Sequence, residues 1–196
     1  PLPVVQHWPE YRGDMSRETE IRVAWDDDYL WVSGRFYDDP DAVRANSLQR
    51  DRWDGDDAFD IVIDSYNDDQ TALKFTTTPL GVLLDGEILN DAQWTGGIQA
   101  QNDDWNTFWD AETRRTEEGW FAEVRIPPSS LGFSVVDGRA VMGLIVSRHM
   151  AARNEKHIFP AIPPDWDMAH FKPSQARDVA LEGVEEQASV WVTPYA

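Results

Sequence analysis

The sequence predicts an all-β protein that folds as an antiparallel β-sandwich of the jelly-roll or immunoglobulin-like kind, with few short helices. Three observations lead to this prediction. Apolar and polar residues alternate along most of the chain, turn-forming residues separate the alternating runs, and no long segment has the period of an amphipathic helix. Short antiparallel strands that each bury one face pack together as two facing sheets. With 196 residues, of which 41% are hydrophobic, the chain can bury a core of this kind.

The alternation places the strands one by one along the chain. In YLWVSGRFY, residues 29–37, the apolar Leu30, Val32 and Phe36 share one face and most intervening residues are polar or aromatic. The same period of two is present in seven further segments: 21–25, 58–64, 72–78, 81–88, 119–127, 140–149 and 190–195. Aspartate, asparagine, glycine and proline fill the intervals between most of these segments, as turns require.

Helical signals are confined to two short segments. Residues 41–45 follow a proline and are predicted to form one turn, and residues 127–131 begin with two prolines and are predicted to form another. Residues 89–108 and 150–177 show no regular alternation and are predicted as loops or insertions. Because neither a repeat of fixed period nor a boundary is visible, residues 1–196 are predicted to form a single domain.

The composition excludes several classes of partner and site. The 36 acidic and 17 basic residues give a net charge of −19, which repels nucleic-acid backbones and anionic membrane surfaces. A neutral, cationic or metal-bearing partner is compatible with this charge. Cysteine is absent, which excludes disulfides, thiolate metal sites and cysteine nucleophiles. No apolar run reaches about 18 residues, so the sequence predicts no transmembrane helix of its own.

Acidic doublets recur along the chain and allow two interpretations. Aspartate closes turns by bonding to its own backbone, and it also supplies the hard oxygen ligands that calcium prefers. No D-x-[DN]-x-[DN]-G loop is present to decide between the two. A structural Ca²⁺ is therefore an open prediction, with these candidate ligands: Asp27, Asp28, Asp38 and Asp39.

The motifs of the common enzyme classes are missing. The chain has no G-x-S-x-G elbow, no H-E-x-x-H, no phosphate-binding P-loop and no G-x-G-x-x-G. Its four histidines, His7, His149, His157 and His170, are scattered. With so many carboxylates, a pair spaced for glycoside hydrolysis arises by chance and carries no weight. The sequence therefore favours a protein that is not an enzyme.

Tryptophan is unusually frequent in this chain, because ten tryptophans are far more than a sandwich core needs. Trp53, in RDRWDGDD, and Trp166, in PPDWDMAHF, lie in charged segments that are predicted as loops. An exposed indole is a platform for a pyranose ring, whose axial C–H groups meet the negative face of the π-system. Packing against the sandwich is expected for most of the others: Trp8, Trp25, Trp31, Trp94, Trp105, Trp109 and Trp120.

Five segments resemble the family 9 carbohydrate-binding modules, and more closely the family-9-like domain of bacterial envelope proteins. They are ETEIRVAWDDDYLWVSGRFYDDPD (18–41), RWDGDDAFDIVIDSYND (52–68), ALKFTTTPLGVLLD (72–85), GWFAEVRIPPSSLGF (119–133) and VMGLIVSRHMAARNE (141–155). The resemblance implies a β-sandwich that holds calcium. In the members that bind sugars, it also implies a terminal sugar clamped between two tryptophans.

The resemblance also implies the site residues. Trp53 falls on the first clamp position and Trp166 on the second. Asp60 and Lys74 fall on neighbouring strand positions, where the family places polar groups that bond sugar hydroxyls. Lys74 stands where an arginine is expected, which argues against bidentate bonding of two hydroxyls.

In the envelope proteins this domain precedes a large outer-membrane barrel, and the ending LEGVEEQASVWVTPYA resembles that junction. The chain begins PLPVVQHWPE, without Met, without a signal peptide and without the strand that opens such domains. We therefore expect a fragment of a longer protein or a stand-alone descendant of one. The resemblance implies a periplasmic or extracellular location.

Three functions follow from these observations. The first is a non-catalytic carbohydrate-binding module of the cell envelope, which stacks a saccharide on loop tryptophans. The second is a periplasmic or extracellular accessory subunit, docked on a protein partner in a membrane complex and with a vestigial sugar site. Aromatic residues are also enriched at protein interfaces, so the excess of tryptophan fits this function as well. The third is a glycoside hydrolase, for which the sequence supplies no motif.

Overall fold

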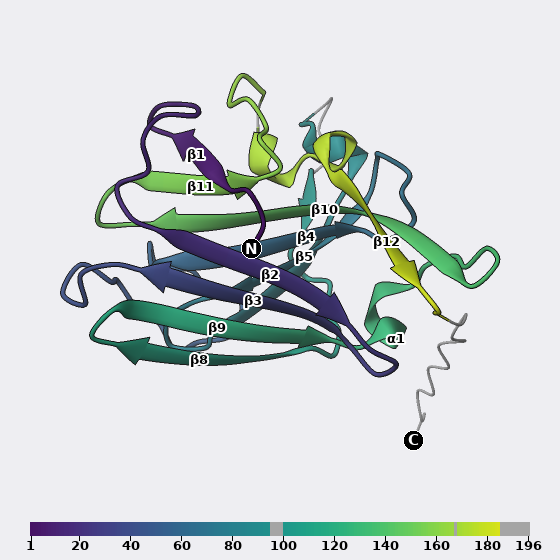
Figure 1. The fold of residues 1–196 in the computed structure, drawn as a ribbon, viewed down its shortest axis with the longest axis horizontal. Coiled ribbons are helices and arrows are strands. Elements are labelled where there is room, and N and C mark those ends of the chain that lie inside the picture. The colour runs from purple at the N-terminus through teal and green to yellow at the C-terminus, as the bar shows by residue number, and fades with distance from the viewer. Residues whose placement is uncertain (95–99, 167, 185–196) are drawn as a thin grey trace.

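Two antiparallel β-sheets that pack face to face form the structure. It is a computed structural model that describes residues 1–94, 100–166 and 168–184. Figure 1 shows the smaller sheet lying across the larger one. The predicted all-β antiparallel sandwich is confirmed. Within the described ranges the single α-helix is the four-residue α1 (Pro128–Leu131), as the two prolines at 127 and 128 predict.

The larger sheet contains eight strands in the described part of the chain. Their order is β1-β11-β10-β4-β5-β6-β7, and β12 also pairs with β10. The bounds are β1 (Val5–Trp8), β4 (Ala58–Asp64), β5 (Ala72–Thr77), β6 (Leu83–Ile88), β7 (Gln101–Asn102), β10 (Arg139–Met150), β11 (Glu155–Phe159) and β12 (Arg177–Glu182). With 12 residues, β10 is long enough to pair with β12 along its first half and with β11 along its second half.

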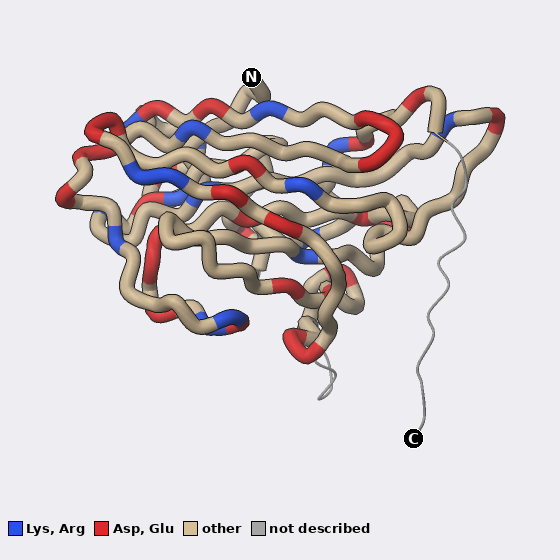
Figure 2. The backbone as a smooth tube through the Cα atoms, turned by 90° about the horizontal axis from the view of Figure 1, so that it is seen from below, with Lys and Arg blue, Asp and Glu red and all other residues tan. Residues whose placement is uncertain are grey.

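The smaller sheet has the order β2-β3-β9-β8. The bounds are β2 (Thr19–Trp25), β3 (Leu30–Tyr37), β8 (Asp110–Thr116) and β9 (Gly119–Ile126). The turn between β2 and β3 is closed by Asp26, whose carboxylate accepts hydrogen bonds from the backbone N–H groups of Asp28 and Tyr29. Figure 2 shows acidic residues gathered in turns such as this one, where they serve as turn formers.

The core lies between the two sheets and follows from the alternation of the strands. Ile21, Val32 and Phe36 of the smaller sheet are fully buried against Phe59 and Ile61 of the larger sheet. The ring centroids of Phe36 and Phe59 lie 4.9 Å apart, which is a favourable distance for tilted aromatic packing. This burial of apolar area is the main term that holds the layers together.

A second apolar cluster covers part of the outer face of the larger sheet. Val62, Ile145 and Ile158 point away from the sandwich core and pack with Ile162 and Ala169. The last two come from the segment after β11, which contains the short 3₁₀ turns η2 (Ala169–Phe171) and η3 (Pro173–Gln175). Every residue of β4 is consequently buried, although only one of its faces meets the smaller sheet. The uncovered remainder of this outer face is where the candidate site lies.

An ion pair and a set of hydrogen bonds join the layers at Arg148. This residue of β10 is 0% exposed, and its guanidinium donates to the carbonyl oxygens of Glu18 and Tyr37 in or beside the smaller sheet, each at 3.0 Å. It also lies 3.5 Å from the carboxylate of Asp38, which accepts closer bonds from Arg153 at 2.8 and 3.1 Å. Burial by itself raises the pKa of Asp38, but the bonds from Arg153 hold it below its usual value.

Several strands differ from the sequence-based prediction, and each difference has a physical reason. The predicted loops at 89–108 and 150–177 contain β7 and β11, and β12 begins where the second of them was predicted to end. The missed strand β8, DAETRRT, is a polar edge strand without apolar alternation. β1 was missed because it is short and lies at the edge of the larger sheet.

Four further predictions concern a helical turn, a strand near the end of the chain, a transmembrane helix and the number of domains. Residues 40–42 form a turn that overlaps the start of the predicted helical segment 41–45. The predicted strand at 190–195 lies outside the described residues. Over the described residues, no helix has the length and apolar character to span a bilayer. The single-domain assignment stays a prediction.

We expect Asp38→Asn to lower the free energy of unfolding by about 3 kcal/mol, because it leaves the buried charge of Arg148 with less compensation. Denaturant unfolding at pH 7 measures this change. Asp39→Asn is the matched control, since Asp39 is the exposed neighbour in the same turn. Equal stability of the two variants would contradict the account of Arg148.

Candidate functional site

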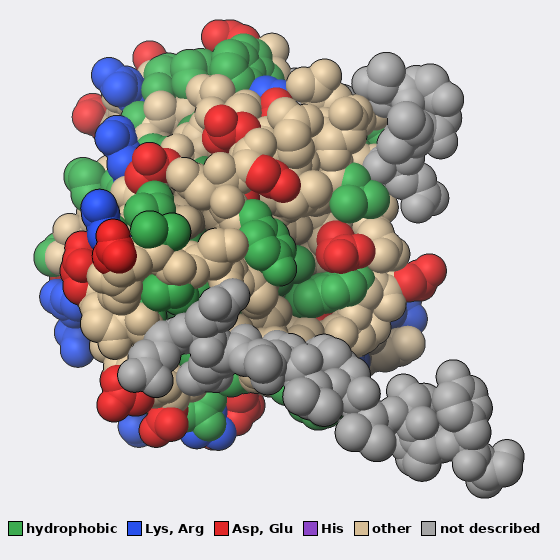
Figure 3. All heavy atoms as spheres, turned by 90° about the vertical axis from the view of Figure 1, so that its right-hand side faces the viewer, with side chains coloured by type: hydrophobic (Ala, Val, Ile, Leu, Met, Phe, Trp, Pro, Cys, Tyr) green, Lys and Arg blue, Asp and Glu red, His purple; other side chains and the backbone are tan. Residues whose placement is uncertain are grey.

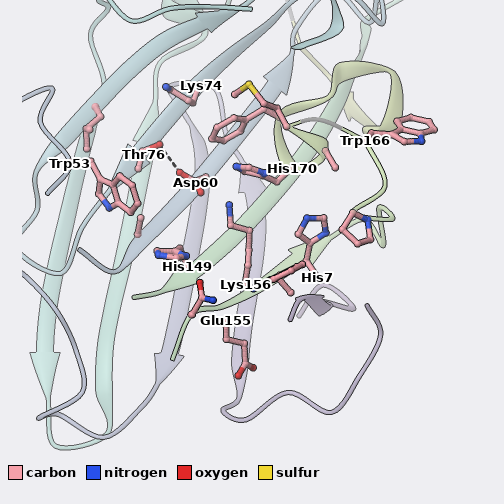
Figure 4. A pocket seen from close by; sticks show the side chains of 18 residues that line it. His7, Trp53, Asp60, Lys74, Thr76, His149, Glu155, Lys156, Trp166 and His170 are labelled. Atoms are coloured by element: carbon pink, nitrogen blue, oxygen red, sulfur yellow. Dashed lines mark hydrogen bonds between the residues drawn. The ribbon is translucent and has the colours of Figure 1, made fainter. Parts of the chain in front are cut away.

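A cavity of about 480 Å³ lies on the outer face of the larger sheet, beside the second apolar cluster. Its size is typical of sites for small molecules, which occupy about 300–1,000 Å³. Figure 4 shows the side chains that line it. The four residues predicted from the sequence, Trp53, Asp60, Lys74 and Trp166, all line this one cavity.

Two rows of cross-strand neighbours build the floor of the cavity. Residues directly opposite each other in antiparallel strands project from the same face of a sheet. The first row runs across β1, β11, β10 and β4 and consists of Trp8, Lys156, His149 and Ala58. The second row runs across β10, β4, β5 and β6 and consists of Ser147, Asp60, Thr76 and Leu84. The walls come from Trp53, from Pro164 and Trp166, and from residues 168–171.

Trp53 is fixed by polar contacts and is still half-exposed. Its indole Nε1 donates to the carbonyl oxygen of Asp56 at 2.8 Å, and its ring meets the edge of His149 at 5.6 Å between centroids. The acidic doublet that follows it holds the loop. The Asp56 carboxylate accepts from the backbone of Ser47, and the Asp57 carboxylate accepts from the backbone of Ala151. The side chain is 51% exposed, so one large apolar surface remains available to a ligand.

Trp166 stands at the other end of the cavity, as Figure 4 shows. It is 41% exposed, and the ammonium of Lys172 lies 5.1 Å from its ring centroid. Lys172 itself is tied to the carboxylate of Asp91 in η1 (Asn90–Ala92). The two indoles therefore bracket a row of polar side chains, and the structure does not place them face to face across one position.

Asp60 and Lys74 lie between the indoles and already have partners. The two carboxylate oxygens of Asp60 accept hydrogen bonds from the hydroxyls of Thr76, at 2.8 Å, and Ser147, at 3.0 Å. The ammonium of Lys74 donates to Gln101 at 3.1 Å and to Asp103 at 2.8 Å. Each carboxylate oxygen keeps a second lone pair and the ammonium keeps a third proton, so both groups can still bond a ligand hydroxyl.

Lys156 projects into the middle of the cavity from β11. No ion pair or hydrogen bond joins its ammonium to another group in the part of the chain that the structure describes, and the ammonium lies 6.0 Å from the ring centroid of Phe171. Burial lowers the pKa of Lys156, and the negative charge of Asp60 partly offsets this effect.

Three of the four histidines, His7, His149 and His170, line the cavity. Burial lowers the pKa of each, and for His170 the charge of Lys156 is the next cause. They are therefore neutral at pH 7, when each imidazole has one donor and one acceptor. The fourth, His157, bonds to Glu155 at 2.6 Å and to Thr19 at 2.8 Å, away from the cavity.

The residues proposed as calcium ligands do not form one site. Asp27 and Asp28 precede β3, whereas Asp38 and Asp39 follow it, so a strand of eight residues, or about 26 Å, separates the two pairs. The carboxylate of Asp38 is also taken by arginines. Among the residues that the structure describes, no group of three or more histidine or acidic side chains is placed to hold a metal ion. Calcium binding elsewhere stays a prediction.

Sequence reasoning missed Trp8, Lys156, Phe171 and the three cavity histidines as a group. For Lys156 a signal was present: in EKHIF the period of two places Glu155 and His157 on one face and Lys156 on the other. The segment was predicted as a loop, so its faces were not considered. For Phe171 the sequence carries no comparable signal, because its position depends on how the covering segment docks on the sheet.

The cavity combines apolar surfaces with charged and hydrogen-bonding groups. Apolar indoles lie at its ends, and neutral imidazoles, hydroxyls, an aspartate and two ammonium groups lie between them. The carboxylate of Glu155, which also borders the cavity, bonds to the backbone N–H of Ser16 at 2.9 Å and to His157. Figure 4 shows this side chain turned away from Asp60, so the two carboxylates do not face a common substrate position.

Comparisons with known proteins support this description. A family model described as "Carbohydrate family 9 binding domain-like" matches residues 4–157. No sequence among the curated proteins is significantly similar to the chain.

Two similar solved structures illustrate the fold. One is a family 9 carbohydrate-binding module from Caldicellulosiruptor kristjanssonii in complex with cellotriose, 19% identical, with a TM-score of 0.57 and coverage of 97% of this chain and 89% of that one. The other is a candidate carbohydrate-binding protein from Bacteroides uniformis, 14% identical, with a TM-score of 0.66 and coverage of 94% of this chain and 87% of that one. At these identities the likeness concerns the fold.

The histidines give a prediction for pH. Because burial lowers the pKa of His170 in the folded state, the unfolded chain binds this proton more readily. The stability that neutral His170 contributes is therefore present above pH of about 6.5 and is lost as the pH falls below it. NMR titration of the imidazole C–H signals should give midpoints below 6.5 for His7, His149 and His170, with His170 the lowest. A midpoint at or above 6.5 for His170 would show that it is exposed to water.

Proposed function

Because this chain belongs to the carbohydrate family 9 binding domain-like family, we propose that it is a non-catalytic module that binds a saccharide in the cavity on the outer face of the larger sheet. The observation that carries the proposal is Trp53. It is a half-exposed indole that is fixed in place by its own N–H bond and by His149, at the edge of a cavity with a polar floor.

The physical match between this cavity and a sugar is specific. A pyranose has an apolar face of C–H groups and a rim of hydroxyls, so it needs an aromatic platform beside hydrogen-bonding groups. Trp53 supplies the platform at one end and Trp166 at the other. Because the indole of Trp53 is already held in place, binding of a sugar costs little additional side-chain entropy.

The polar floor provides partners for hydroxyls. Asp60 accepts from a hydroxyl with its remaining lone pairs, and Lys74 donates with its remaining proton. Neutral His149 and His170 add imidazole groups that can donate or accept. A site of this kind gives millimolar to micromolar affinity, or about 4–8 kcal/mol. We further propose that the module works in the periplasm or outside the cell, where saccharides are met, and that a calcium ion supports its structure.

A second candidate function is an accessory subunit docked on a membrane complex. It is favoured by large apolar side chains that are exposed away from the cavity, namely Leu48, Tyr66 and Val136. Figure 3 shows one face of the molecule, on which apolar groups lie among acidic and basic side chains. Sugar binding is the function that we prefer, because the indole of Trp53 and the polar side chains of the cavity lie together at one site.

The test is titration of the protein with glucose, cellobiose and xylobiose, followed by tryptophan fluorescence. We expect a saturable change for at least one of these sugars. In Trp53→Ala the affinity should fall by about 30-fold, which corresponds to about 2 kcal/mol of lost stacking, while the circular dichroism spectrum stays unchanged.

Trp25→Ala is the matched control. Trp25 is 42% exposed and its indole N–H also bonds to one carbonyl oxygen, that of Glu182, but it lies on β2 of the smaller sheet. This variant should bind the sugars as the unaltered protein does. A flat titration of the folded protein with every sugar would contradict the proposed function and would favour the docking subunit.

A further inference from the structure

We infer that the saccharide bound in this cavity carries a carboxylate, as a hexuronic acid does, and that Lys156 is the residue that pairs with it. This inference rests on the proposed function and deepens it, because it names the chemical class of the sugar. The observations that carry it are the position of Lys156 on the cavity floor and the absence of a partner for its ammonium among the described residues.

The three lysines of the chain differ in one respect. The ammonium of Lys74 is paired with Asp103 and that of Lys172 with Asp91. Lys156 forms no ion pair with a carboxylate in the described part of the chain. The other two lysines each form one, so Lys156 differs from both. Its charge is partly removed from water without a compensating ion pair, which costs free energy that a bound anion would recover.

The described neighbours of Lys156 do not provide a counter-charge for its ammonium. In the register of the sheet it lies between Trp8 on β1 and His149 on β10, and neither side chain is acidic. The acid that faces the same cavity is Asp60, whose two oxygens already accept from Thr76 and Ser147. The carboxylate of the preceding residue, Glu155, bonds on the other side of the strand.

The charged and titratable groups around Lys156 come from several elements. Lys74, His149 and His170 face it from β5, β10 and η2, and Asp60 faces it from β4. The charge of Lys156 disfavours protonation of His170, so this imidazole stays neutral beside the ammonium. A carboxylate ligand would compensate the charge of Lys156 and would raise the pKa of Lys156 toward its usual value.

The net charge of −19 acts in the opposite direction, but over a different range. Surface charges that are farther from the ligand than about 8 Å are largely screened at physiological ionic strength. A contact between an ammonium and a carboxylate inside a partly enclosed cavity is screened much less. The contact between Lys156 and the ligand carboxylate therefore decides whether a charged sugar is preferred. Salt weakens the repulsion between the ligand and the net negative charge of the protein more than it weakens this contact.

A hexuronic acid fits both parts of the cavity. Its ring offers the apolar C–H face that an indole binds, and its carboxylate is attached directly to the ring. With its ring against Trp53, a hexuronic acid would direct its carboxylate toward Lys156 on the cavity floor. A neutral sugar of the same shape offers only a hydroxymethyl group at that position and leaves the ammonium without a counter-charge.

The experiment compares matched glycosides that differ only in this group. Methyl β-D-glucuronide and methyl β-D-glucoside, and the corresponding galacturonide and galactoside, are titrated at pH 7 and 0.15 M salt by isothermal calorimetry. We expect one uronide to bind at least about tenfold more tightly than its neutral counterpart, as a charge-assisted bond provides. In Lys156→Met this preference should disappear, so that the uronide and its neutral counterpart bind with equal affinity.

Two further variants keep the result interpretable. Lys156→Arg retains the charge and should retain the preference. Arg125→Gln removes one positive charge from an exposed position on β9 of the smaller sheet and should leave the preference unchanged, which controls for net charge. Thermal unfolding of each variant shows whether the fold is intact.

The outcomes separate this inference from the proposed function. Equal binding of a uronide and its neutral counterpart, or a preference that persists in Lys156→Met, overturns the inference and leaves sugar binding in place. Binding of cellobiose without binding of any of the four glycosides overturns the inference as well. Failure of the folded protein to bind any sugar overturns the proposed function itself.

Discussion

The structure depends on one buried arginine more than on any other polar residue. Arg148 belongs to the larger sheet, and its guanidinium bonds to the backbone at the ends of strands in the smaller sheet and to Asp38. Because the cost of burying this charge is met only when the layers are aligned, Arg148 fixes how the sheets lie relative to each other. The next residue, His149, projects to the opposite face. Because the two residues are adjacent, the contacts of Arg148 in the core also fix where His149 lies in the cavity floor.

The cavity lies outside the main core, so the residues that line it differ from those that hold the two sheets together. The main core lies between the sheets, whereas the cavity lies on the outer face of the larger sheet, beside a second and smaller apolar cluster. The segment 160–176 covers part of this face and contributes Trp166 and His170 to the cavity. A substitution on the exposed side of the cavity can thus alter ligand contacts without opening the sandwich.

The sequence allowed the fold class and part of the site to be predicted, for reasons that individual residues illustrate. Trp53 and Trp166 were singled out as tryptophans in charged, loop-like segments, and the family resemblance assigned Asp60 and Lys74 beside them. Lys156 was missed, because what distinguishes it is that no carboxylate of the described residues pairs with its ammonium, and partners are set by three-dimensional distance. The polar edge strand β8 and the docking of Phe171 were equally hidden, since neither produces a periodic apolar pattern.

The central claim is that a saccharide occupies this outer-face cavity, and NMR with a ¹⁵N-labelled sample tests it most directly. On addition of a saccharide, the account predicts that the indole N–H signal of Trp53 and the amide signals of His149 and Lys156 shift together. The indole signal of Trp25, on the smaller sheet, should stay in place. Shifts that centre on the smaller sheet, with the signal of Trp53 unchanged, would contradict the claim.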